Sequence, residues 1–258
     1  MSHALASDGT RIAFQVDGTG PPLLLLAGQA NNHHWWDPVR ADFATTHQVV
    51  TLDYRGTGAS DAPTSGYSTP EFAEDAVAVL DELDLPHVDV YGTSMGGRVA
   101  QWLAARHSDR VRRLVLGCTT PGGVHAIERD IDVRRAVAQP DAAAARQALL
   151  ELMYTPAWLA DHPGPYTTLG DPDMPVHARK RHFTASANHD AWDVLPLISA
   201  PTLVVHGADD IFNPAANAPL LAGRIPDARM ELVDGARHAY FEEFRAVASP
   251  LVLDFVGS

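Results

Sequence analysis

Ser94 is the residue whose surroundings most clearly suggest chemistry. It stands in the pattern G-x-S-x-G, which runs from Gly92 to Gly96. An apolar run at 87–91 predicts a buried strand before it, and residues 97–105 predict a helix after it. A sharp turn between a strand and a helix exposes a serine hydroxyl at the edge of a sheet, and glycines leave room for that turn. We therefore interpret Ser94 as a nucleophile; the alternative is an ordinary serine that caps the helix.

A serine hydroxyl needs a base to remove its proton, and the base needs a third group that orients it. Two apolar runs near the end of the chain each predict a strand that is followed by a suitable side chain. The run at 203–206 is followed by Asp209 and Asp210, and the run at 230–233 is followed by His238. These residues are the candidates for the orienting acid and the base.

Strand and helix signals alternate along the first half of the chain. The short, wholly apolar runs at 23–27 and 49–53 are typical of parallel strands that are covered on both faces. The alternation predicts an α/β fold with a mostly parallel sheet. The expected elements are an outer strand at 11–16, further strands at 23–27, 49–53, 87–91 and 111–117, and a helix from a cap at Thr69 to about Leu83.

The pattern changes between 119 and 196, where strand signals vanish and helical stretches are broken by prolines and glycines. Strand character returns at 201–206 and 229–233, and a final helix is expected from about 240 to 255. We predict a helical cap that folds over the carboxyl edge of the sheet, because ligands bind there in α/β folds. The alternative is a plain run of surface helices. The predicted division is a core at 1–119 and 199–258 with a cap at 120–198.

Across essentially its whole length the chain resembles the α/β-hydrolase superfamily. The resemblance implies an eight-stranded, mostly parallel sheet flanked by helices, a cap after the sixth strand, and catalytic residues in the order Ser, Asp or Glu, His. In relatives the acid follows the pattern G-x-x-D-x-x-x-P, and Gly207 and Pro214 place Asp210, rather than its neighbour, in that pattern. Of 13 histidines, only His238 holds the family position of the base. The implied triad is completed by Ser94.

The resemblance also implies an oxyanion hole made by two backbone N–H groups. One belongs to Met95, directly after the predicted nucleophile. The other lies in the loop after the strand at 23–27, where relatives read His-Gly-x and this chain has Ala27, Gly28 and Gln29. Gln29 is the expected second donor, because only a backbone group is required at that place.

Five side chains are candidates for substrate contacts, each with core packing as the alternative interpretation. They are Trp36, which matches a tryptophan common downstream of the oxyanion loop in relatives, and, in the predicted cap, Tyr154, Trp158, His189 and Trp192.

Neither a metal site nor a cofactor is expected. His33 and His34, with Asp37, could suggest metal ligands, but adjacent residues rarely converge on one ion and no third ligand has a suitable spacing. The segment at 53–61 resembles the family's D-x-R-G-x-G-x-S loop, which implies a structural loop beside the site rather than a catalytic one.

These features predict a serine hydrolase that cleaves a small carboxylic ester or lactone through an acyl-enzyme. Haloalkane dehalogenases and epoxide hydrolases have an aspartate where this chain has Ser94, which disfavours both activities. Among serine members, the stretches 54–60, 94–97, 101–104 and 154–158 resemble oxoadipate enol-lactonase-like hydrolases. Three alternatives stay open, because a fold does not determine a substrate: a cofactor-free haloperoxidase-like or carbon–carbon bond hydrolase, an acyl transferase or cyclase, and a non-catalytic ligand-binding protein.

Composition limits the partners and the location. The 258 residues include 19 Lys and Arg against 32 Asp and Glu, and the net charge of −13 argues against nucleic acid or an anionic membrane as a partner. Cys118 is the only cysteine, so an intrachain disulfide is impossible. The first dozen residues contain Asp8 and Arg11 but no apolar signal-peptide core, and no apolar stretch approaches the roughly 20 residues of a membrane span. We expect a cytoplasmic protein, of an oligomeric state that the sequence leaves open.

Overall fold

One sheet of eight strands forms the centre of the molecule, in a computed structural model that describes residues 2–257. The strands are β1 (Ser2–Leu5), β2 (Arg11–Asp17), β3 (Pro22–Leu26), β4 (Gln48–Leu52), β5 (Val88–Thr93), β6 (Val111–Gly117), β7 (Thr202–Gly207) and β8 (Ala228–Val233). Their order is β1-β2-β4-β3-β5-β6-β7-β8. β2 runs antiparallel to both of its neighbours, and all other pairings are parallel. The predicted eight-stranded, mostly parallel sheet is confirmed.

The central strands are buried along almost their whole length, as their apolar runs predicted. Every residue of β5 and β7 is buried, and so are the last four residues of β3 and of β4. The strand predicted at 11–16 is β2, which is the second strand from the edge of the sheet. β1 forms the edge and pairs with β2, with Ser2 opposite Phe14 and Leu5 opposite Arg11. β1 itself was not predicted, since only Ala4 of its residues is buried and no apolar alternation marks it.

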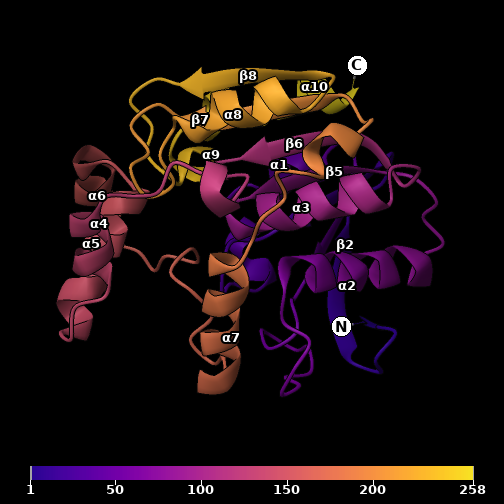
Figure 1. Ribbon diagram of the computed structural model, residues 1–258, viewed down its shortest axis with the longest axis horizontal. Helices are drawn as coiled ribbons and strands as arrows, with labels where there is room; N and C mark the ends of the chain where they lie inside the picture. The colour runs from indigo at the N-terminus through magenta and orange to yellow at the C-terminus, as the bar shows by residue number, and fades with distance from the viewer. Residues whose placement is uncertain (1, 258) are drawn as a thin grey trace.

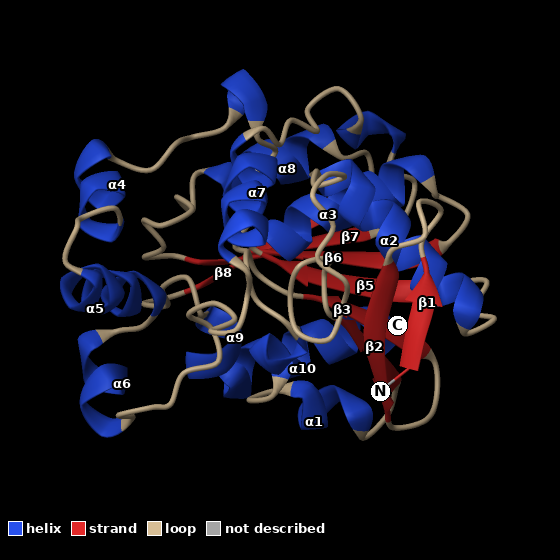
Figure 2. Cartoon of the chain, turned by 90° about the horizontal axis from the view of Figure 1, so that it is seen from below, coloured by secondary structure: helices blue, strands red, loops and turns tan. Residues whose placement is uncertain are grey.

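Helices cover both faces of the sheet. They are η1 (His33–Trp36), α1 (Arg40–Ala44), α2 (Thr69–Glu82), α3 (Met95–Arg106), α8 (Asn217–Arg224), α9 (Tyr240–Glu243) and α10 (Arg245–Gly257). Figure 2 shows α2, α3 and α8 on one face and α1, α9 and α10 on the other. α2 is capped by the side chain of Ser68, which accepts from the N–H of Glu71, so the cap precedes the predicted Thr69 by one residue. The predicted final helix is divided at Phe244 into α9 and α10.

The segment between β6 and β7, at 118–201, contains helices and is called the helical insertion below. Its elements are η2 (Gly123–His125), α4 (Ile131–Val137), α5 (Ala142–Met153), α6 (Pro156–Asp161), α7 (Val176–Ala187) and η3 (Leu195–Leu197). Apart from a single bridge between Gly122 and Asp190, this fully described segment has no β-pairing. In Figure 1, α4, α5 and α6 gather on one side of the molecule and α7 lies apart from them.

Away from its two ends, the helical insertion is held to the rest of the described chain by backbone hydrogen bonds at two places. Near its middle, the N–H of Asp171 donates to the carbonyl of Ala30 at 2.7 Å. The end of α5 is held by the residue before α9, because the N–H of Ala239 donates to the carbonyl of Met153 at 2.9 Å. By contrast, neither α4 nor α6 has a buried residue. Over residues 2–257, none of the helices combines the length and the apolar composition needed to cross a membrane.

A buried ion pair anchors the loop after β4. Arg55 is fully buried and forms two parallel hydrogen bonds to Asp75 of α2, from Nε at 2.8 Å and from Nη2 at 2.6 Å. Its Nη1 reaches the carboxylate of Asp8 at 2.8 Å. The backbone carbonyl of Arg55 lies 2.9 Å from Nε2 of His182 on α7. One arginine therefore links the sheet, α2 and the helical insertion.

We expect the replacement of Asp75 by asparagine to destabilise the protein strongly. Asp75→Asn keeps the shape of the side chain but removes the only fully buried carboxylate that pairs with Arg55 within the described residues, and the partly exposed Asp8 remains. The loss should lower the free energy of unfolding by about 3 kcal/mol. Urea unfolding measures this change. The control is Glu74→Gln on the same helix, where the side chain is partly exposed and the loss should stay below about 1 kcal/mol. Equal losses in the two variants would contradict this account.

Candidate active site

Ser94 occupies a strained turn between β5 and α3. Its backbone has φ 56° and ψ −120°, which a residue with a side chain adopts only when its surroundings enforce it. A Cβ added to Gly92 would overlap the carbonyl of Gly96, and a Cβ added to Gly96 would overlap the carbonyl of Leu26. Both glycines of the G-x-S-x-G pattern are therefore required by close backbone packing.

Asp210 and His238 come together from the loops after β7 and β8. Nδ1 of His238 donates to Oδ2 of Asp210 at 2.8 Å, while Oδ1 accepts from the N–H groups of Phe212 and Asn213 at 2.8 and 2.9 Å. Nε2 of His206 lies 3.3 Å from Oδ2. Every oxygen of this fully buried carboxylate is thus bonded. The carboxylate holds the imidazole in the tautomer that has its lone pair on Nε2.

The charge of Asp210 is stabilised by these partners. Burial raises the pKa of Asp210, but the electrostatic interaction with His238 and the hydrogen bonds from His206 and His238 outweigh that effect. The pKa of Asp210 therefore lies well below its usual range, and the carboxylate stays ionised at neutral pH.

Ser94 and His238 line the same cavity, which has a volume of about 940 Å³. His238 is almost completely buried, and its Nε2 makes no hydrogen bond to any group of residues 2–257. Ser94 is 9% exposed, so its position is covered but reachable from the cavity. An imidazole with a free Nε2 beside a serine hydroxyl can accept the proton of that hydroxyl during attack on a carbonyl.

The two predicted oxyanion donors come from different elements, the start of α3 and the loop after β3. Met95 is the first residue of α3, so its N–H has no acceptor within the helix. Gln29 follows β3 and lines the cavity. The carbonyl of Gly28 accepts from the N–H of Asn31 at 3.3 Å, and in a trans peptide the N–H of Gln29 points the opposite way. The side chain of Asn31 donates to the carbonyl of Gln29 at 2.9 Å, which holds the other peptide plane of this residue.

Of the five predicted substrate contacts, only His189 lines the cavity. It is buried, and its Nδ1 lies 2.9 Å from the hydroxyl of Thr69. Burial, followed by the charge of Arg98, lowers the pKa of His189 well below its usual value. This histidine is therefore neutral at physiological pH.

The other four aromatic residues do not line this cavity and pack elsewhere. Trp36 is fully buried in the core against Tyr91 and Phe241, at ring distances of 5.0 and 5.4 Å. Tyr154 is fully buried, with its hydroxyl 2.6 Å from that of Thr168 and also bonded to Glu242. Trp158 stacks on His162 at 3.6 Å and Trp192 on His125 at 4.2 Å. The contacts of these four side chains fit a role in packing.

The sequence analysis did not predict one tryptophan and two arginines that line the cavity. Trp35, the neighbour of Trp36, lines the cavity, and its Nε1 donates to the hydroxyl of Thr93 at 2.9 Å. Arg98 also lines the cavity, and its position four residues after Ser94 was a signal, because such residues share a helix face. Arg129 reaches the cavity from the loop before α4, where no periodic pattern marks it.

The histidines considered as metal ligands have partners within the protein. Nδ1 of His33 lies 2.7 Å from the carboxylate of Asp53, and Nδ1 of His34 lies 2.6 Å from that of Asp37. In the part of the chain from 2 to 257, no three His, Cys, Asp or Glu side chains are grouped so that they could hold a metal ion.

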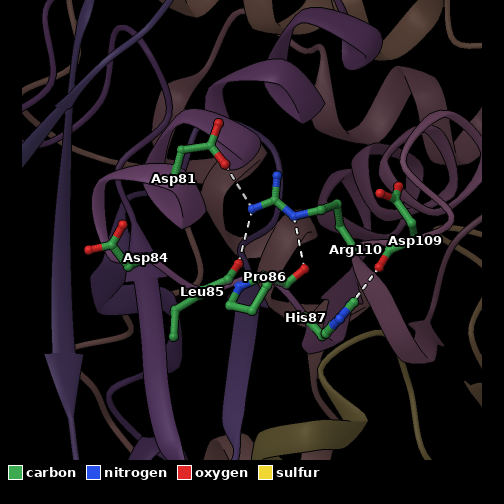
Figure 3. A pocket seen from close by; sticks show the side chains of 7 residues that line it. All are labelled: Asp81, Asp84, Leu85, Pro86, His87, Asp109 and Arg110. Carbon is green, nitrogen blue, oxygen red and sulfur yellow. Dashed lines mark hydrogen bonds and ion pairs between the residues drawn. The ribbon is translucent and has the colours of Figure 1, made fainter.

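A second hollow, of about 580 Å³, lies between the end of α2 and the start of β5, at the opposite end of β5 from Ser94 (Figure 3). Its central side chain is Arg110, which pairs with Asp81 at 2.8 Å and donates to the carbonyls of Leu85 and Pro86 at 3.0 Å each. These polar groups satisfy one another. None of the described residues that line this hollow is a Ser, Thr or Cys, so the cavity at Ser94 is the candidate active site.

Comparison with known proteins agrees with this architecture. A family described as alpha/beta hydrolase fold matches residues 21–244. A putative carbamate hydrolase, RutD, of Azorhizobium caulinodans is 30% identical over 100% of this chain and 98% of its own length. Among solved structures, the enol-lactonase of Burkholderia xenovorans LB400 has a TM-score of 0.85 at 26% identity and covers 100% of both chains. The esterase EaEST of Exiguobacterium antarcticum has a TM-score of 0.87 at 25% identity, over 100% of this chain and 99% of its own.

The low pKa of Asp210 predicts how stability depends on pH. Its native pKa lies below the unfolded value of 3.8, so the native protein binds fewer protons than the unfolded chain between these two values. The stabilisation is complete above the unfolded pKa and is lost as the pH falls through it toward the native pKa. We expect Asp210→Asn to lower the free energy of unfolding by about 2–4 kcal/mol at pH 7, and the gap from wild type to shrink below about pH 4.

Denaturant unfolding at pH 7, 4 and 3 measures this gap. The matched control is Asp209→Asn, because Asp209 is exposed and lies next to Asp210 in the chain. That variant should follow wild type at each pH. A gap for Asp210→Asn that widened as the pH fell would contradict the predicted sign.

Proposed function

The chain belongs to the α/β hydrolase fold family, and from this premise we propose that it is a serine hydrolase that cleaves a carboxylic ester or lactone through an acyl-enzyme. The observation that carries the proposal is the 2.8 Å hydrogen bond between Asp210 and Nδ1 of His238, which leaves Nε2 unpartnered in the cavity that Ser94 also lines. The enol-lactonase and esterase structures of the same fold support this substrate class.

Each step of the proposed reaction uses one of these groups. Nε2 of His238 takes the proton of Ser94 as the hydroxyl oxygen attacks the carbonyl carbon. The N–H groups of Met95 and Gln29 bind the oxygen on which negative charge develops, and each is worth about 3–4 kcal/mol to the transition state. His238 then protonates the leaving alkoxide. A water activated by the same histidine hydrolyses the acyl-enzyme and releases Ser94.

Asp210 acts through the histidine. The imidazolium that forms when His238 accepts a proton faces an ionised, fully bonded carboxylate, so its charge is stabilised when it develops. Phe212 and Asn213 hold the other carboxylate oxygen through their N–H groups, which prevents Asp210 from turning away from the ring.

We infer that the helical insertion serves as a cap at 120–198 over a core at 1–119 and 199–258. Residues of α4, α5 and α7 supply one wall of the cavity, including Val137, Leu149 and Phe183. The sheet side supplies the other wall with Ser94 and His238. A substrate in this cavity would therefore be enclosed between the two parts, away from bulk water.

A carbamate is the second candidate substrate class. It is favoured by the similarity to the putative carbamate hydrolase over the whole chain. Attack of Ser94 on a carbamate carbonyl would use the same base and the same oxyanion donors, and only the leaving group would differ.

We expect purified protein to hydrolyse short p-nitrophenyl esters, and Ser94→Ala to lower kcat by at least about 10⁴-fold, because no other group can form the acyl-enzyme. An enol-lactone and a p-nitrophenyl carbamate measured in parallel would rank the substrate classes. A fluorophosphonate should add to wild type on the peptide that contains Ser94, and mass spectrometry identifies the modified residue.

Thermal unfolding of Ser94→Ala serves as the control for folding, and Ser249→Ala, a buried serine of α10, is the matched control for activity. Turnover that survives in Ser94→Ala would overturn the assignment of the nucleophile. If wild type binds ligands but neither turns over any ester, lactone or carbamate nor reacts with the fluorophosphonate, the protein is a binding protein on this fold.

A further inference from the structure

The charged side chains that line the active-site cavity are almost all basic, although the protein as a whole carries a net charge of −13. One acidic residue, Glu128, faces five arginines. The arginines are Arg98, Arg129, Arg134, Arg146 and Arg179. A cavity with walls of one charge sign attracts ligands of the opposite sign, because low-dielectric walls focus the field.

Most of these arginines have no carboxylate partner. Arg134 pairs with Glu128 at 2.7 Å. Arg98 instead donates to the carbonyl and the hydroxyl of Ser186 at 2.6 and 2.8 Å, and Arg129 donates to the amide oxygen of Asn213 at 3.3 Å. Neither of these two arginines forms an ion pair with an Asp or Glu within residues 2–257.

The two guanidinium groups line the same cavity, and each is affected by burial. Burial and then the charge of Arg129 lower the pKa of Arg98 to about 10, and burial likewise lowers the pKa of Arg129. Nε of Arg98 is buried and has no hydrogen-bond partner in the described chain. Neighbouring cations and an unbonded buried donor are both costly, and an anion bound between them would relieve both costs.

Both arginines lie beside the reacting groups. Arg98 stands one helical turn after Ser94 on α3. The guanidinium of Arg129 lies 4.0 Å above the ring of Phe212, and that ring packs edge-on against His238 at 5.0 Å. An anion held between Arg98 and Arg129 would therefore be next to the place where a carbonyl meets Ser94.

We propose that Arg98 and Arg129 bind a carboxylate of the substrate, so that the preferred ester carries an ionised carboxylate besides the carbonyl that Ser94 attacks. The inference rests on the proposed hydrolysis for the ester, but the anion site itself stands on the arginines. Guanidinium groups suit this task because their planar donors match the two oxygens of a carboxylate.

The test compares two p-nitrophenyl esters that have the same five-carbon acyl chain. Mono-p-nitrophenyl glutarate carries a free carboxylate, and methyl p-nitrophenyl glutarate is its neutral counterpart. We expect wild type to have a kcat/KM for the anionic ester that is at least about tenfold higher, and Arg129→Gln to reduce this ratio by about 10- to 100-fold. Arg129→Lys keeps the positive charge but loses the planar donors that can bind both carboxylate oxygens. It should give an intermediate ratio of kcat/KM for the anionic ester to that for the neutral ester.

Arg106→Gln is the matched control, because Arg106 lies on the same helix as Arg98 but outside the cavity, over the ring of Trp102. It changes the net charge by the same amount and should leave the ratio unchanged. Arg98→Gln is the second variant in case Arg129→Gln fails to fold, and it should also lower the ratio. An unchanged ratio in both cavity variants would overturn the inference.

Binding of glutarate to Ser94→Ala, measured by calorimetry, separates this inference from the proposed function. Binding that weakens about tenfold or more when Arg129→Gln is added, but not when Arg106→Gln is added, supports the anion site even if no ester is hydrolysed. Hydrolysis of neutral esters by wild type without preference for the anionic one, together with no glutarate binding at millimolar concentration, overturns the anion site and leaves the hydrolase proposal intact.

Discussion

The close approach of α3 to the end of β3 is the constraint on which the candidate site depends. A Cβ on Gly96 would overlap the carbonyl of Leu26, so the helix begins against the sheet backbone with no side chain between them. In this position the N–H of Ser94 donates to the carbonyl of Gly117 on β6 at 2.9 Å, and its φ is forced to 56°. Strained backbone persists only where the structure around it is rigid. The sheet, rather than a flexible loop, therefore positions the proposed nucleophile.

Local sequence patterns were sufficient for the parts of the fold that are buried on both sides. The apolar run of β3 and the G-x-S-x-G turn each carry their signal within a few residues, and both were predicted correctly. β1 could not be predicted in this way, because its side chains are mostly exposed and leave no apolar pattern. It is a strand because its backbone pairs with β2. A pairing between distant segments leaves little trace in an exposed strand of four residues.

The residues that line the cavity were harder to predict than those of the proposed triad. Trp35 and Trp36 are consecutive, yet one faces the cavity and the other the core, because the short helix η1 turns them to different sides. Arg129 comes from an irregular loop whose path depends on the packing of the whole helical insertion. The net negative charge of the chain also concealed the basic cavity, since composition records the sum of the charges and not their distribution.

This distribution has a mechanistic consequence for the proposed reaction. Arg98 belongs to the helix that begins at Ser94, whereas Arg129 belongs to the helical insertion, so a carboxylate bound by both would join the two walls of the cavity beside the proposed nucleophile. Binding energy from a part of the substrate that does not react can be used to hold the reacting carbonyl in place. A neutral ester would enter the same cavity but would lack this second point of attachment. The two arginines should therefore affect the rate of acylation as well as affinity, because they would fix the distance and angle at which the ester meets Ser94.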